Sequence, residues 1–150
     1  MGRRRGYTLI ELVVVVLIFG ILAAAAAPKY VEAMALYRAH VAAQRVAADI
    51  RRVREHARRT STPQTLSFNT ANHTYSSPNV PDIDRPTLPM SVNLFGGDLG
   101  ATLAAANFGG SPAVQFDIYG RPLTAGAVTV AIGQHTRLVT VDSTGLIAVP

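Results

Sequence analysis

The first sixty residues of the chain show two successive apolar patterns. Residues 9–27 are apolar with few interruptions, and as a helix these nineteen residues would rise about 28 Å, close to the roughly 30 Å hydrocarbon core of a bilayer. Further along, apolar positions recur at steps of three and four, the spacing of one face of an amphipathic helix. We therefore predict a helix that is transmembrane over residues 7–27 and amphipathic over residues 28–60. The apolar positions of the second half are Leu36, Ala39, Ala43, Val46, Ile50, Val53 and Ala57.

Beyond residue 60 the pattern changes to the alternation that is typical of β-strands. Prolines within residues 77–90 predict an extended surface loop, and glycines within residues 96–112 predict a second irregular region. The remaining strands are expected to form a hairpin followed by an antiparallel meander. The predicted fold class is α+β, with the long N-terminal helix packed on a small antiparallel β-sheet domain at residues 61–150. The expected strands are 64–69, 73–76, 113–118, 127–132, 137–142 and 146–149.

A single carboxylate, Glu11, lies near the start of the apolar segment. An ionisable side chain inside a membrane costs roughly 2.5–3.5 kcal/mol on insertion scales, and it usually has a partner. We therefore expect a group that neutralises Glu11. Arg3, Arg4 and Arg5 precede the segment, so the positive-inside bias predicts that they stay in the cytoplasm and that the residues after Pro28 lie outside.

The segment Gly6-Tyr7-Thr8-Leu9-Ile10-Glu11 resembles the type III signal of type IV pilins and type II secretion pseudopilins. In these families a prepilin peptidase cuts after the glycine and methylates the new N-terminus. The resemblance implies a leader at residues 1–6 and a mature N-terminus at Tyr7. It also implies that the Glu11 carboxylate pairs with the N-terminal amine of a neighbouring subunit during filament assembly.

Pro28 would be the twenty-second residue of the mature chain, where these families often have a proline that kinks the helix. Two other interpretations of the N-terminal segment remain open. One is an ordinary secretory signal peptide, cleaved after the small residues Ala25 and Ala27, and the other is an anchor that is never processed. The charge of Glu11 fits a signal peptide poorly, and a cut after Gly6 leaves the apolar segment attached to the mature protein.

The order of long helix, hairpin, variable loop and C-terminal strands resembles the GspH/FimT class of minor pseudopilins and minor pilins. Val114-Gln115-Phe116-Asp117-Ile118-Tyr119-Gly120 is similar to that class's strand-then-glycine element, and Val139-Thr140-Val141-Asp142-Ser143-Thr144-Gly145 is similar to its closing strand and turn. The resemblance implies a non-enzymatic subunit of the type II secretion pseudopilus, anchored in the inner membrane with its C-terminal domain in the periplasm. The implied partners are prepilin peptidase, other pseudopilins or pilins that bind through the N-terminal helix, and secreted cargo.

An alternative within the same class is a FimT-like minor pilin of a type IV pilus, which binds DNA for uptake. Such members have a C-terminal Gly-Arg-x-Arg motif that contacts phosphate, whereas this chain reads Gly145-Leu146-Ile147-Ala148. This departure makes DNA the less expected partner.

Arginines recur every seven residues along the amphipathic segment and form a stripe beside its apolar face. They are interpreted either as a solvated helix flank, favoured near the negative C-terminal end of the helix dipole, or as a contact for a polyanion. The formal charge of +5 falls to +2 without the leader, because eleven basic residues then face nine acids. This small excess weakens the polyanion interpretation. The stripe consists of Arg38, Arg45, Arg52 and Arg59.

Catalytic and metal-binding patterns are scarce in the sequence. There is no cysteine, so neither a disulfide nor thiolate chemistry is expected. The histidines do not have the spacing of metal ligands, and no serine lies in a Gly-x-Ser-x-Gly motif. We expect no catalytic residue, no metal and no cofactor, although Asp117 and Asp142 are weak candidates for binding a cation. The histidines are His40, His56, His73 and His135.

Overall fold

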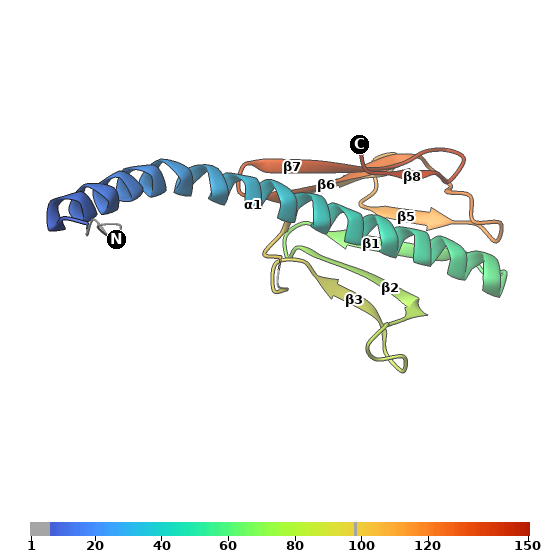
Figure 1. The fold of residues 1–150 in the computed structure, drawn as a ribbon. Coiled ribbons are helices and arrows are strands. Elements are labelled where there is room, and N and C mark those ends of the chain that lie inside the picture. Colours follow the sequence, from blue (N-terminus) through green and yellow to red (C-terminus); the bar gives the residue numbers. More distant parts are fainter. Residues whose placement is uncertain (1–6, 98) are drawn as a thin grey trace, which may run out of the picture. The chain divides into compact units, whose positions relative to one another are not determined.

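The computed structural model describes residues 7–97 and 99–150, except for the side chains of residues 25, 26 and 28. It divides into two compact units, Met1–Met34 and Ala35–Pro150. The helix α1, Leu9–Thr60, contributes to both units and confirms the long N-terminal helix predicted from the apolar pattern (Figure 1). The predicted leader, residues 1–6, lies outside the described residues.

The C-terminal end of α1 is closed by a backbone motif. Ser61 adopts a left-handed conformation with φ of 49°, and the Thr62 N–H donates to the Ala57 carbonyl at 3.3 Å. This bond satisfies one of the carbonyls that the end of a helix leaves without a partner. The Thr60 hydroxyl donates to the His56 carbonyl at 2.8 Å and satisfies a second one. The chain then turns directly into the first strand.

The strands of the second unit form two antiparallel sheets (Figure 1). The first has the order β3-β2-β1-β5, and the second has the order β4-β6-β7-β8. The strands of the first sheet are β1 Gln64–Asn69, β2 Thr74–Pro81, β3 Pro89–Asn93 and β5 Ala113–Phe116. The strands of the second sheet are β4 Thr102–Asn107, β6 Gly126–Ile132, β7 His135–Val141 and β8 Ile147–Ala148.

The expected C-terminal meander is only partly correct. β6, β7 and β8 pair in succession, but β5 pairs with β1 instead, with Gln64 opposite Phe116. The alternation of side chains predicts that a segment is a strand, but it does not predict which sheet the strand joins. The residues between β5 and β6 therefore cross from one sheet to the other.

The two predicted loops are also partly wrong. β2 continues to Pro81 and β3 begins at Pro89, and both prolines fit because a register shift separates Ser77 from Pro81 and β3 is an edge strand. β4 lies within the predicted irregular region 96–112, where three successive alanines obscure the alternation.

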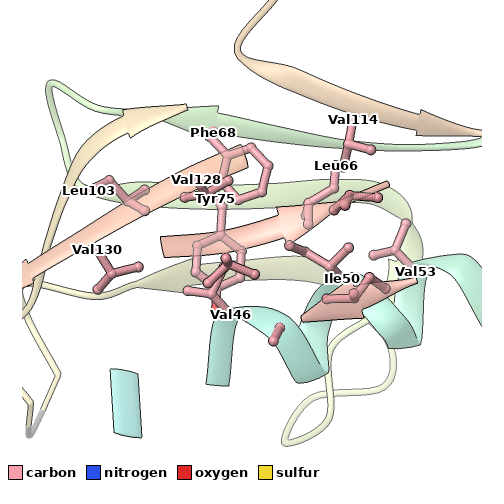
Figure 2. Close-up of a cluster of buried hydrophobic side chains, with 14 of the residues drawn as sticks. Val46, Ile50, Val53, Leu66, Phe68, Tyr75, Leu103, Val114, Val128 and Val130 are labelled. Atoms are coloured by element: carbon pink, nitrogen blue, oxygen red, sulfur yellow. The ribbon is translucent and has the colours of Figure 1, made fainter. Parts of the chain in front are cut away.

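The core of the second unit lies between α1 and the inner faces of both sheets. Six of the seven predicted helix positions, Ala39 to Ala57, are fully buried, whereas Leu36 is 45% exposed and the prediction for it was wrong. In Figure 2, Val46, Ile50 and Val53 face large side chains of β1 and β2. Those partners include Leu66, Phe68 and Tyr75.

Candidate functional site

The N-terminal unit exposes its large apolar side chains. α1 is the one helix among the described residues that is long and apolar enough to cross a membrane, with a mean hydropathy of 2.9 over the best window. Exposure of the described large side chains from Leu9 to Leu22 ranges from 46% to 83%. Such a surface is covered in its working environment, by lipid or by other apolar helices.

Glu11 is held at the start of α1 by a capping box with Thr8. The Glu11 Oε2 atom accepts hydrogen bonds from the Thr8 N–H at 2.8 Å and from the Thr8 hydroxyl at 2.9 Å, and the Glu11 N–H donates to the Thr8 hydroxyl at 3.3 Å. These bonds satisfy helix donors that would otherwise lack acceptors. The pattern Thr-x-x-Glu at Thr8 and Glu11 is the sequence signal of such a capping box, in addition to its resemblance to the processing and assembly motif.

The other residues predicted for processing and for the helix kink are Gly6, Tyr7 and Pro28. Tyr7 is 90% exposed, whereas Gly6 lies outside the described residues. The helix continues through position 28, and the kink implied for Pro28 remains a prediction.

The predicted arginine stripe divides into exposed and engaged members. Arg38, Arg45 and Arg59 are exposed, as a solvated helix flank requires. Arg52 is half-buried, and its guanidinium donates to the Pro81 carbonyl at 2.6 Å. Arg52 therefore fixes the end of β2 to the helix.

Two further arginines, outside the predicted stripe, bind backbone carbonyls of the second sheet. Arg51 donates to the Ile147 carbonyl at 2.9 Å, and Arg54 donates to the Gly145 carbonyl at 2.7 Å. Arg54 also pairs with Glu55 at 2.8 Å, and this contact lowers the pKa of the Glu55 carboxyl. A carbonyl acceptor has no side-chain signature, so the sequence did not reveal these contacts. Part of the cationic end of the helix serves to hold the fold together.

Asp117 and Asp142 organise two similar loops. The Asp117 Oδ1 atom accepts hydrogen bonds from the N–H groups of Tyr119 at 2.9 Å and Arg121 at 2.8 Å, and Asp142 Oδ1 accepts those of Thr144 and Leu146, both at 2.8 Å. Within the described chain, no group of three or more possible ligands could hold a metal ion. The aspartates are therefore loop-forming residues in this structure.

A glycine in each of these loops has a positive φ, 76° at Gly120 and 86° at Gly145. Each glycine N–H donates to the carbonyl of its aspartate at 3.0 Å. The loops lie against one another, since a Cβ added to Gly145 would be 3.0 Å from the Gly120 carbonyl oxygen. Leu146, at the position where the DNA-binding motif would have an arginine, is 63% exposed. Leu146 itself offers no charge to a phosphate, whereas the Arg54 guanidinium beside this loop is bound to the Gly145 carbonyl.

Comparisons with known proteins agree with this architecture. Residues 1–27 match the model of the Prokaryotic N-terminal methylation motif, and residues 42–145 match the model of the Type II transport protein GspH. No match was found among curated proteins.

Two crystal structures of the type IV minor pilin FimU from Pseudomonas aeruginosa PAO1 have a similar fold. One has a TM-score of 0.56 at 13% identity and covers 75% of this chain and 87% of FimU. The other has a TM-score of 0.52 at 13% identity, with coverages of 73% and 90%. At this identity the likeness shows the fold alone. Because the GspH model matches more than half of the chain and the methylation motif precedes it, the chain belongs to the GspH family of pilin-like proteins.

Proposed function

We propose that this pilin-like subunit is a minor pseudopilin of a type II secretion pseudopilus. Before assembly it is anchored in the inner membrane through α1, with its C-terminal unit in the periplasm. The observation that carries the proposal is the combination of an exposed apolar helix, beginning with a capped carboxylate, and a GspH domain. The role is structural, and its main partners are other pseudopilins that pack against the apolar helix.

In this proposal prepilin peptidase cuts after Gly6, and the carboxylate of Glu11 guides assembly. Thr8 donates to only one carboxylate oxygen of Glu11, Oε2. The other oxygen is left for the amine of a neighbouring subunit's mature terminus. Capping by Thr8 reduces the cost of the charge in the single subunit, and the amine completes its neutralisation in the filament.

Processing is tested by intact-mass measurement of the membrane-extracted protein. We expect a mature terminus at Tyr7 with a methyl group, and we expect Gly6→Trp to leave the precursor uncut. A terminus between Ala25 and Pro28 would instead show cleavage by an ordinary signal peptidase.

Assembly is tested with Glu11→Ala, and with Glu32→Ala as a control because Glu32 is an exposed acid further along the same helix. Glu11→Ala should remain inserted in the membrane but be lost from sheared filaments, whereas the control should assemble. Loss of membrane insertion in Glu11→Ala would contradict the proposed role.

The assignment to type II secretion is tested by deleting the gene. Cells that lack the subunit should secrete less exoprotein while pilus-dependent DNA uptake remains intact. The reverse result would place the subunit in a type IV pilus.

A further inference from the structure

The apolar part of α1 ends at a short polar boundary. Residues 12–27 contain no charged side chain, whereas Lys29 and Tyr30 follow within three positions. Lys29 is exposed, and Tyr30 is 68% exposed. Glu32, two residues further on, is exposed as well. Over residues 29–32 the helix therefore changes from a surface that lipid can cover to one that needs polar surroundings.

Lys29 and Tyr30 are of the residue types that favour the boundary between hydrocarbon and water. A tyrosine side chain combines an apolar ring with a polar hydroxyl, and tyrosine is enriched at both interfaces of membrane proteins. A lysine near the end of a membrane helix lays its aliphatic stem on apolar surface and extends its ammonium group to the headgroups. Two such side chains in succession therefore match the headgroup layer of a phospholipid bilayer.

The spacing along α1 fits the thickness of a bilayer. Glu11 and Tyr30 are nineteen residues apart, a rise of about 28 Å in a helix, and the hydrocarbon core is roughly 30 Å thick. With Tyr30 at one boundary of the core, Glu11 lies close to the other one. Tyr7, about one turn before Glu11 and 90% exposed, then reaches the opposite headgroups. A charge at a boundary contacts headgroups and water, so Glu11 costs less there than at the bilayer centre.

We propose that Lys29 and Tyr30 bind the phospholipid headgroup layer on the periplasmic side and thereby set the depth of α1 in the bilayer. The Lys29 ammonium contacts the lipid phosphates, and the Tyr30 ring lies at the level where the acyl chains begin. This depth keeps Glu11 at the cytoplasmic boundary of the hydrocarbon. The inference rests on the proposed membrane anchoring of the unassembled subunit, whereas processing and filament assembly do not enter into it.

The depth of Tyr30 is measured by tryptophan fluorescence. The chain contains no tryptophan, so one substitution creates a unique reporter. The full-length protein is reconstituted in phosphatidylcholine–phosphatidylglycerol vesicles whose acyl chains carry bromine, a contact quencher, either near the headgroup or near the terminal methyl group. The reporter is Tyr30→Trp. The matched controls are Leu22→Trp, at a 59% exposed position about 12 Å nearer the bilayer centre, and Tyr37→Trp, seven residues beyond Tyr30 in the sequence.

We expect Tyr30→Trp to be quenched more strongly by bromine near the headgroup than by bromine near the methyl group. Leu22→Trp should show the opposite preference, and Tyr37→Trp should be quenched least by either lipid. The proposal is overturned if Tyr30→Trp has the same depth preference as Leu22→Trp. It is also overturned if Tyr30→Trp resists quenching as Tyr37→Trp does, because water or another subunit would then surround this position.

A double variant tests whether the two residues set the depth. In Lys29→Leu/Tyr30→Leu the apolar segment continues to Val31, so the helix can slide and release Glu11 from the edge of the hydrocarbon. A reporter next to this carboxylate, Leu12→Trp, should then lose about half or more of its quenching by bromine near the headgroup. Unchanged quenching in the double variant would refute the role of the pair.

Two matched changes should leave the Leu12→Trp reporter at its original depth. Lys29→Arg keeps a cation at the boundary, and Tyr37→Leu removes an exposed tyrosine that lies outside it. A shift with Tyr37→Leu as large as that of the double variant would also refute the assignment. Absence of quenching in Leu22→Trp would overturn this inference together with the proposed anchoring, whereas failure of the Tyr30 tests alone leaves the anchoring and the Glu11 assembly test intact.

Discussion

Replacing Tyr75 with phenylalanine tests how much the hydrogen bond from the Tyr75 hydroxyl to the buried Asp49 carboxylate stabilises the fold. Tyr75→Phe keeps the aromatic ring in the core, where it is 1% exposed, and removes the hydroxyl that donates to Asp49. A hydrogen bond to a charged group contributes about 1.5–3 kcal/mol, and this is the hydrogen bond that Asp49 accepts from a side chain among the described residues. The midpoint of thermal unfolding of the globular unit should fall by about 5–15 °C.

The assay is thermal unfolding of the full-length protein in detergent at pH 7, followed by circular dichroism of the β-structure. Tyr119→Phe is the matched control, because its hydroxyl belongs to a side chain that is 70% exposed and its removal should change stability by less than about 0.5 kcal/mol. In an Asp49→Asn background, Tyr75→Phe should cost only about 1 kcal/mol, since the lost bond is then between neutral groups. Equal costs in both backgrounds would show that Asp49 is not charged in the folded protein.

Three other predictions concern the pH dependence of stability, two glycines and the binding of DNA. Burial raises the folded-state pKa of Asp49 above its ordinary value of 3.8. The free energy of unfolding of the wild type, relative to that of Asp49→Asn, should therefore fall as the pH rises from 3.8 through the folded-state pKa. A difference in unfolding free energy that does not change with pH in chemical denaturation would refute this. Gly126→Ala places a Cβ against the Asn107 carbonyl and should cost about 3 kcal/mol, whereas Gly110→Ala, with φ of 93° and open space around it, should cost only about 1–2 kcal/mol. We expect duplex DNA to bind weakly in a fluorescence anisotropy titration. Changing three exposed arginines to glutamine should leave the slope of log affinity against log salt concentration nearly unchanged, whereas this slope would change by about 2.7 if the three arginines contacted phosphates. The triple change is made at Arg38, Arg45 and Arg59.

The sequence by itself determined the helix and the face that it buries. A long apolar segment and a three-to-four spacing depend only on residues that are neighbours along one helix. Ala39 to Ala57 can therefore be placed in the core without any knowledge of tertiary contacts. The hydrogen bonds between Thr8 and Glu11 can also be predicted from the sequence, because both residues belong to the first turn of the helix.

Tertiary structure alone decided how the strands divide between two sheets and which side chains of α1 bind the strands. β5 joins β1 across a long stretch of chain, and that choice depends on which inner face each side chain can cover. The hydrogen bonds from Arg52 to the Pro81 carbonyl and from Tyr75 to Asp49 form only once the sheets are packed on α1. Local periodicity specifies which residues face inward, but contacts between distant segments and with backbone carbonyls are set by the packing of the whole unit.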